Sequence, residues 1–166
     1  MKFGISVSQI HEVDLVIQAE NVGYDFCWVW DSPMIRSNLW ALLALVAHRT
    51  STISLGPGVA IPGLAMAPVT ANAIGTINAI APGRTFLGVG TGNTALRAMG
   101  QVPMGIAELK AHLKVIRGLI SGEKVTYEAN GRSEEISFQS LELGYINLDD
   151  PIPIHVSGFG PKAQAL

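Results

Sequence analysis

Short apolar runs alternate with longer segments of helical periodicity along the whole chain. The short runs are rich in β-branched and aromatic residues, and they predict five strands at residues 2–7, 25–30, 53–61, 84–89 and 152–156. The longer segments repeat apolar residues at spacings of three and four, and they predict four helices at residues 11–23, 39–50, 67–79 and 106–121. A further helix begins within residues 157–166.

The alternation of strand and helix predicts an α/β fold with a right-handed parallel sheet. Two architectures fit this pattern: an open sheet, or a TIM (β/α)8-type barrel of which the chain carries about the first five βα units. A closed eight-stranded barrel needs roughly 250 residues, and this chain has 166. In a partial barrel the first and last strands are exposed edges, which pair with another chain, are covered, or promote aggregation.

One segment between the fourth helix and the last strand departs from the alternation. Asn130-Gly131 separates two alternating runs within residues 125–138, and Asn-Gly favours a type I′ turn. The segment therefore predicts a β-hairpin. We interpret it as an insertion, at about residues 124–139, in a single domain that covers residues 1–166.

Composition narrows the classes of function. The chain is 48% hydrophobic and 14% charged, with a net charge of −2, so nothing indicates a nucleic-acid partner. The single cysteine, Cys27, lies in an apolar strand and excludes an internal disulfide and a thiolate metal cluster. The histidines lack metal-ligand spacing, so we expect no metal. Without a signal peptide or an uninterrupted apolar span, we expect a cytoplasmic protein with no membrane segment.

Polar and glycine-rich segments follow the strands, at the edge where parallel β/α proteins bind ligands. Asp31 follows the second strand, either as a functional carboxylate or as a turn cap. The run Gly90-Thr91-Gly92-Asn93 allows close backbone approach to a ligand, or simply forms a tight turn. The run Ser157-Gly158-Phe159-Gly160 opens the last helix, either as an anion site or as a capped helix start. Arg84 and Arg97 are expected to be ordinary surface arginines.

Four segments carry a family resemblance: DSP at residues 31–33, LGPGVAIPG at 55–63, APGRTFLGVGTGN at 81–93 and IPIHVSGFGPKAQAL at 152–166. In this order they resemble the luciferase-like flavin- and deazaflavin-dependent oxidoreductases, which include bacterial luciferase and methylenetetrahydromethanopterin reductase. The similarity covers essentially the whole chain. Because members of this family are usually about twice this length, the chain resembles the N-terminal half of a family member.

The resemblance implies a TIM-type barrel that binds coenzyme F420, or alternatively FMN, at its C-terminal face. It implies a non-prolyl cis peptide between Gly58 and Val59 that backs the central ring of the cofactor. It places Asp31 near that ring, the run Gly90–Asn93 along the ring and its tail, and the run Ser157–Gly160 at the cofactor phosphate.

Two positions differ from the sugar-phosphate dehydrogenases of this family. Ser32 stands where those enzymes carry a catalytic histidine, and Asn93 stands where they carry a glutamate. Neither serine nor asparagine relays a proton near neutral pH. The two differences argue against sugar-phosphate oxidation as the activity of this chain.

Three hypotheses about function follow. The first is an oxidoreductase that transfers a hydride between coenzyme F420 and an organic substrate, with Asp31 as the candidate catalytic residue. The second is an FMN-dependent monooxygenase on the same scaffold. The third is a truncated barrel half without catalytic activity, acting through a partner chain. We expect a small-molecule substrate, and either a homo-oligomer or association with a missing C-terminal half.

Overall fold

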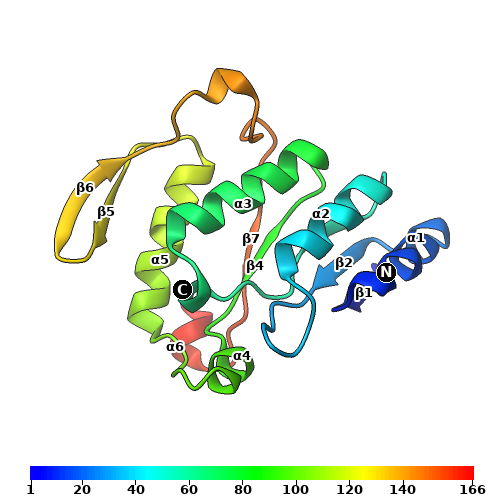
Figure 1. Ribbon diagram of the computed structural model, residues 1–166, viewed down its shortest axis with the longest axis horizontal. Coiled ribbons are helices and arrows are strands. Elements are labelled where there is room, and N and C mark those ends of the chain that lie inside the picture. Colours follow the sequence, from blue (N-terminus) through cyan, green and yellow to red (C-terminus); the bar gives the residue numbers. More distant parts are fainter.

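The predicted parallel strands form one curved row, and the helices cover its outer side (Figure 1). The computed structural model describes residues 1–166. Parallel pairing joins β1 to β2, β2 to β3 and β4 to β7, and single bridges join β3 to β4. The strands of this row are β1 (Gly4–Val7), β2 (Phe26–Val29), β3 (Ser54–Pro57), β4 (Leu87–Val89) and β7 (Ile154–Val156).

The four main helices begin and end within two residues of the predicted limits. They are α1 (Val13–Asn21), α2 (Leu39–Arg49), α3 (Ala67–Ile80) and α5 (Ile106–Ile120). Asn38 caps α2, since its Oδ1 accepts a hydrogen bond from the Ala41 N–H at 3.1 Å. Two shorter helices are α4 (Asn93–Ala98) and α6 (Pro161–Gln164), and 3-10 turns occupy Ile10–Glu12, Pro62–Leu64 and Leu141–Leu143. The sequence did not predict α4, because six residues are too few to show a helical period.

All five parallel strands are shorter than predicted. β3 ends at Pro57, where the cis peptide Gly58–Val59 follows, and parallel pairing resumes only as a bridge from Ala60 to Val89. β4 begins at Leu87 rather than residue 84, and β7 begins at residue 154 rather than 152. Each apolar run therefore marked the whole extended segment, whereas regular strand pairing covers only part of it.

Alternate strand residues point toward the helices and form the hydrophobic core. Cys27, Leu55 and Leu87 are fully buried, and Leu43 of α2 and Ile74 of α3 belong to the same cluster. Burying a side chain of this size contributes about 1.5–3 kcal/mol. Cys27 is thus a buried thiol, as predicted, and burial raises its pKa to about 12.

The other side of the strands carries an aromatic cluster. The His155 ring stacks on Phe86, with centroids 5.1 Å apart and planes 8° apart, and the Trp28 ring lies 4.3 Å from Phe86. His155 is exposed, because no strand continues the row beyond β7. The outer edges of β1 and β7 are likewise unpaired, as a partial barrel predicts, and barrel closure is not observed.

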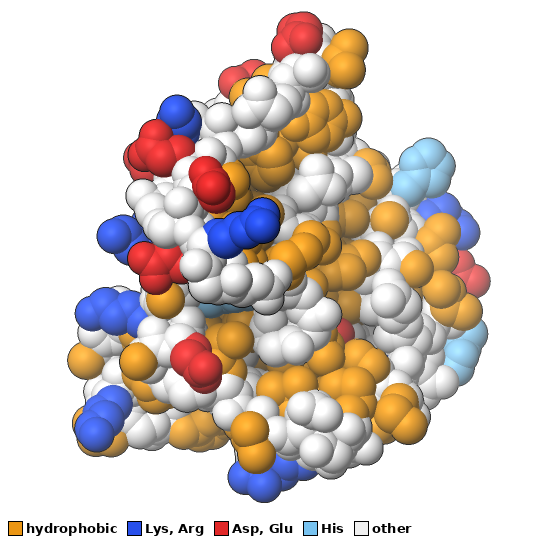
Figure 2. All heavy atoms as spheres, turned by 60° about the vertical axis from the view of Figure 1, so that its left-hand side comes forward, with side chains coloured by type: hydrophobic (Ala, Val, Ile, Leu, Met, Phe, Trp, Pro, Cys, Tyr) orange, Lys and Arg blue, Asp and Glu red, His pale blue; other side chains and the backbone are white.

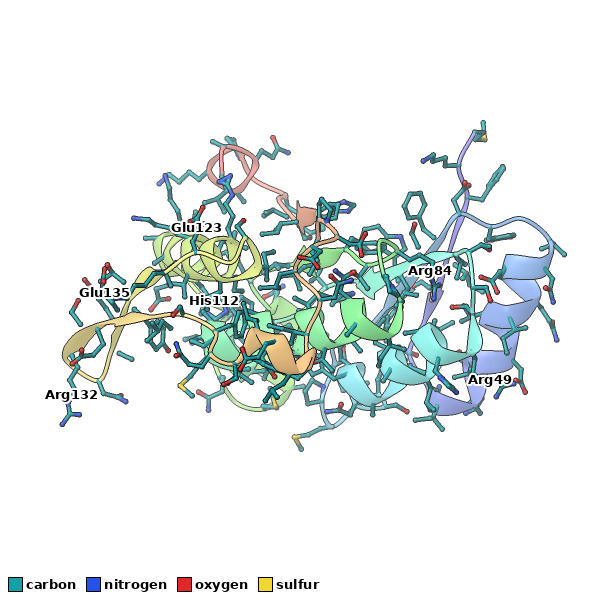
Figure 3. All side chains as sticks on the ribbon, turned by 90° about the horizontal axis from the view of Figure 1, so that it is seen from above. Arg49, Arg84, His112, Glu123, Arg132 and Glu135 are labelled. Atoms are coloured by element: carbon teal, nitrogen blue, oxygen red, sulfur yellow. The ribbon has the colours of Figure 1, made fainter.

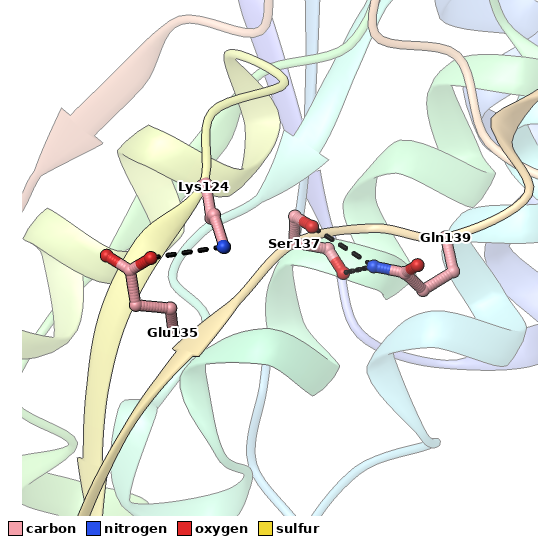
Figure 4. Close-up of polar contacts among 4 residues, drawn as sticks. All are labelled: Lys124, Glu135, Ser137 and Gln139. Carbon is pink, nitrogen blue, oxygen red and sulfur yellow. Dashed lines mark hydrogen bonds and ion pairs between the residues drawn. The ribbon is translucent and has the colours of Figure 1, made fainter.

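The predicted hairpin is present and projects from the body of the molecule beside α5 (Figure 1). Its antiparallel strands are β5 (Val125–Ala129) and β6 (Arg132–Ile136). Asn130 and Gly131 both have positive φ, at 53° and 72°, as a type I′ turn requires. At its base, Lys124 pairs with Glu135 at 3.1 Å, and the Gln139 amide donates to the Ser137 carbonyl at 3.0 Å (Figure 4).

Arg84 is not the surface arginine that the sequence predicts. Its guanidinium is half-buried and donates to the carbonyls of Ala47, Thr50 and Ile53 at 3.0–3.1 Å, and to the Thr50 hydroxyl at 3.1 Å (Figure 3). Burial lowers the pKa of this group. Arg84 therefore joins the end of α2 to the start of β3, at the end of the strands opposite the loops after β3 and β4.

The low charge content is visible at the surface. Hydrophobic side chains reach solvent between the charged ones on the face shown in Figure 2. Val102, Leu143 and Phe159 are among the most exposed large hydrophobic residues. No helix in the structure is both long and apolar enough to cross a lipid bilayer.

Candidate cofactor site

A cavity of about 490 Å³ opens at the carboxyl ends of the parallel strands. The loops after β2, β3, β4 and β7 all contribute to its wall, so segments far apart in sequence meet at one point. All the site residues predicted from the sequence line it, except Gly158 and Gly160. The lining residues are Trp30, Asp31, Ser32, Gly58, Val59, Ile61, Gly90, Thr91, Gly92, Asn93, Thr94, Ala95, Ser157 and Phe159.

Asp31 carries the only ionisable side chain in the cavity wall. Its Oδ2 accepts a hydrogen bond from the Ile61 N–H at 3.1 Å, which leaves the other carboxylate oxygen without a protein partner. Burial raises the pKa of Asp31 to about 6, although the Ile61 hydrogen bond favours the charged form. Near neutral pH this carboxyl group can therefore both accept and donate a proton, whereas an exposed aspartate stays ionised.

The peptide bond between Gly58 and Val59 is cis, as the resemblance implied, and both residues line the cavity. The Gly58 N–H donates to the Val29 carbonyl of β2 at 2.7 Å. A Cβ atom at Gly58 would lie 2.8 Å from the Cβ of Trp28, so only glycine fits this close approach. The bend at Gly58–Val59 thus packs against β2 on one side and lines the cavity on the other.

The loop after β4 packs directly against this bend. A Cβ atom at Gly90 would lie 2.7 Å from Cγ2 of Val59, so glycine is needed for contact between the two loops. Gly92 has a φ of +78° and precedes α4. Asn93 begins α4, where its Oδ1 accepts a hydrogen bond from Arg97 Nε at 2.8 Å, and Arg97 is exposed, as predicted.

The loop after β7 meets the cavity only in part. The Ser157 N–H donates to the Val89 carbonyl at 2.8 Å, which fixes Ser157 beside the loop after β4. Ser157 and Phe159 line the cavity, whereas Gly158 and Gly160 do not. A Cβ atom at Gly158 would lie 2.9 Å from the backbone of Ala163, so Gly158 is needed to pack α6 instead.

Several cavity residues were not predicted. The alternation Phe26, Trp28, Trp30 along β2 was the available signal for Trp30, since these positions share one face of a strand. The sequence did not indicate Ile61, because this residue contacts Asp31 through its backbone N–H, a group that every non-proline residue has. The remaining unpredicted residues are Ser32, Thr94 and Ala95.

Histidine, cysteine and carboxylate side chains do not cluster into a metal site. No group of three or more His, Cys, Asp or Glu side chains has the geometry to hold a metal ion. His112 on α5 is half-buried, its Nε2 has no hydrogen-bond partner, and burial lowers its pKa (Figure 3). It does not line the cavity, whose polar side-chain groups are hydroxyls, one indole N–H, one amide and one carboxyl group.

The sequence of this chain matches the family model described as luciferase-like monooxygenase over residues 7–166. The chain belongs to the luciferase-like monooxygenase family. It is 34% identical over 172 residues to a 5,10-methylenetetrahydromethanopterin reductase of Archaeoglobus fulgidus, covering 100% of this chain and 50% of that protein. It is 33% identical over 165 residues to an F420-dependent glucose-6-phosphate dehydrogenase of Kineococcus radiotolerans, covering 89% of this chain and 46% of that protein.

A solved structure shows the same fold. The coenzyme F420-dependent tetrahydromethanopterin reductase of Methanopyrus kandleri superimposes with a TM-score of 0.75 at 24% identity, over 96% of this chain and 51% of that one. The chain thus matches about half of a luciferase-like TIM barrel. It also spans about half the length of the curated relatives it matches.

Proposed function

We propose that this chain forms the cofactor-binding part of an oxidoreductase that transfers a hydride between coenzyme F420 and an organic substrate. The observation that carries the proposal is the convergence of Asp31, the cis peptide Gly58–Val59, the run Gly90–Asn93 and Ser157 in one cavity. Relatives named as F420-dependent enzymes support the choice of cofactor.

The residues present fit a cofactor of this kind. The cavity volume of about 490 Å³ lies within the range of roughly 300–1,000 Å³ typical of ligand pockets. The cis bend and the glycine loop after β4 offer a backbone wall for a flat ring. Hydroxyl groups of Thr91 and Ser157 lie in the same wall and supply hydrogen bonds to polar ring or tail atoms. When bound, coenzyme F420 supplies the hydride chemistry itself.

Asp31 is the proposed proton-handling residue. Oxidation of an alcohol removes a hydride from carbon and a proton from oxygen, and Asp31 is the ionisable group in the wall that can accept that proton. Its free carboxylate oxygen and its raised pKa, about 6, suit this role in both reaction directions. Because the wall holds no lysine, arginine or histidine, this part of the site favours uncharged substrates over phosphorylated ones.

We also propose that the unpaired edges of β1 and β7 pair with further strands. A C-terminal half of the barrel or a second copy of the chain is the proposed source. Parallel strand edges carry rows of free N–H and C=O groups that favour such pairing. The exposed His155 beside Phe86 would then be covered inside the completed barrel.

A fluorescence titration of the purified chain with coenzyme F420, with FMN as the competitor, tests the proposed function. We expect saturable binding in the micromolar range, weakened by Gly90→Val, whose side chain would collide with Val59. Thr76→Val, on the exposed face of α3, is the control and should bind as the wild type does. Preferential FMN binding would favour the monooxygenase hypothesis. A folded chain that binds neither cofactor would favour a non-catalytic barrel half.

A further inference from the structure

Trp30 occupies an unusual place for a tryptophan, at the mouth of the cavity with 41% of its surface exposed. It directly follows β2, next to Asp31. Its indole N–H donates a hydrogen bond to the Ser6 hydroxyl of β1. The Arg36 guanidinium lies 5.6 Å from the centre of the Trp30 ring, a cation–π distance. Contacts from two other segments therefore fix the orientation of the indole.

A fixed and exposed aromatic ring is a ready-made wall for an apolar ligand. The side chain is already ordered in the free protein, so ligand contact with the ring contributes to affinity with little further loss of conformational entropy. Phe159 lies in the wall of the same cavity and is 95% exposed. The cavity wall thus has aromatic side chains from the loops after both β2 and β7.

The position of Trp30 separates it from the proposed cofactor wall. In the strand order, the cis bend and the glycine loop follow β3 and β4, whereas Trp30 lies over β1 and β2. Asp31 lies between the two parts, next to Trp30 in sequence and bonded to Ile61 of the loop after β3. A substrate whose oxygen reaches Asp31 would therefore place its remaining carbon atoms beside Trp30.

We propose that Trp30 is a specificity-determining residue that contacts the hydrocarbon part of the substrate and selects uncharged carbonyl compounds or alcohols with a planar or cyclic apolar group. This inference rests on the proposed function. Ser6 and Arg36 are positioning residues, since they hold the indole and do not themselves line the cavity.

Acetophenone, an uncharged aryl ketone, is the probe for this proposal. Its dissociation constant is measured calorimetrically with the chain loaded with oxidised F420, which has no hydride to give to the ketone, alongside the dissociation constant of F420 itself. We expect Trp30→Ala to weaken acetophenone binding by about tenfold, the scale of a lost aromatic contact, and to change F420 binding by less than about threefold. Trp30→Phe should restore most of the affinity, and Ser6→Ala should give a smaller loss because it removes only an orienting bond.

Glucose 6-phosphate is the contrast probe. We expect it to bind more weakly than acetophenone to the wild type, and the ratio of the two affinities to fall in Trp30→Ala. Three results would overturn the proposal: no saturable acetophenone binding by the F420-loaded chain, equal affinity in wild type and Trp30→Ala, or an equal loss of F420 and acetophenone affinity. Failure to load F420 would instead reject the proposed function, and acetophenone binding to the unloaded chain would then decide whether Trp30 forms an apolar wall.

Discussion

The Asp31 carboxylate and the Ile61 backbone, thirty residues apart in sequence, meet in the cavity wall, where Oδ2 accepts the Ile61 N–H at 3.1 Å. This bond ties the loop after β2 to the loop after β3. It therefore couples the position of the one ionisable side chain of the cavity to the segment that contains the cis peptide.

The pH dependence of stability should report the state of Asp31. Burial raises its pKa from 3.8 to about 6 in the folded chain, so the folded state holds this proton more tightly than the unfolded state. The group therefore stabilises the fold below about pH 4, and this contribution is lost as the pH rises through about 6. The loss is at most about 3 kcal/mol, because one pKa unit corresponds to about 1.4 kcal/mol.

Asp31→Asn removes this titration and keeps an amide oxygen for the Ile61 N–H. Urea unfolding at about pH 4 and about pH 8 should show that the variant gains about 1–3 kcal/mol relative to the wild type at the higher pH. Asp14→Asn, at an exposed position of α1, controls for the loss of a carboxylate. A difference between Asp31→Asn and wild type that stays constant with pH would contradict the raised pKa.

Gly90→Ala tests the contact between the loops after β3 and β4. The new methyl group would lie 2.7 Å from Cγ2 of Val59, closer than packing allows. We expect a loss of about 1–3 kcal/mol in the free energy of unfolding, measured in urea, since overpacking forces the backbone to shift. Gly160→Ala, where a Cβ atom meets nothing within 4 Å, should cost less than about 1 kcal/mol. An equal loss of stability in Gly90→Ala and Gly160→Ala would show that the loops after β3 and β4 shift easily to accept the methyl group.

Arg84→Met should destabilise the fold strongly, although the sequence suggests a surface position. The change leaves the carbonyls of Ala47, Thr50 and Ile53 without their donor, at a cost of about 2–4 kcal/mol. Arg49→Met is the matched control, since Arg49 forms an exposed ion pair with Asp14 and should cost no more than about 0.5 kcal/mol. Thermal and urea unfolding of both variants measure the difference, and similar stabilities would refute the role of Arg84.

Asn78, like Arg84, forms several hydrogen bonds away from the cavity. Its amide donates to the carbonyls of Asn147 and Asp150 at 3.0 and 2.9 Å, and its Oδ1 accepts the Thr85 hydroxyl at 2.5 Å. Asn78→Ala should therefore cost about 2–4 kcal/mol in urea unfolding. Asn72→Ala, an exposed position of the same helix, should be nearly neutral. A neutral Asn78→Ala would mean that water replaces all three bonds.

Cys27 should be unreactive in the native chain. The thiol is fully buried, and burial raises its pKa to about 12, so little nucleophilic thiolate is present. A thiol-reactive disulfide reagent should react slowly in buffer and completely in denaturing urea. Rapid reaction of native protein would indicate that β2 opens often.

Local periodicity predicted most of the fold. The helical spacing of α2, α3 and α5 located these helices to within two residues, because their apolar faces are long enough to show a period. The run Asn130-Gly131 predicted the hairpin turn, since the turn requires positive φ at both positions. The predicted end of β3 and the predicted start of β4 were wrong, because pairing depends on the neighbouring strand as well as on the apolar run.

The site was predicted less completely. Glycine and polar residues after strands indicated the loops that line the cavity, and the structure brings Asp31, Gly90 and Ser157 into its wall. Gly158 and Gly160, predicted from the same loop, do not line this cavity, and Gly158 packs closely against α6 instead. Trp30 was not among the candidate site residues, because the contacts with Ser6 and Arg36 that orient its indole join segments that are separate in the sequence.

The sequence by itself determined the βα order, the buried strand faces and the edge of the sheet where the cavity opens, because these follow from the periods and order of strand and helix. Only the tertiary structure decided which loops touch, which arginine is buried and which carboxyl group has a raised pKa. Those properties depend on distances between residues far apart in the chain, such as Asp31 and Ile61 or Arg84 and Ala47, and local patterns do not contain them.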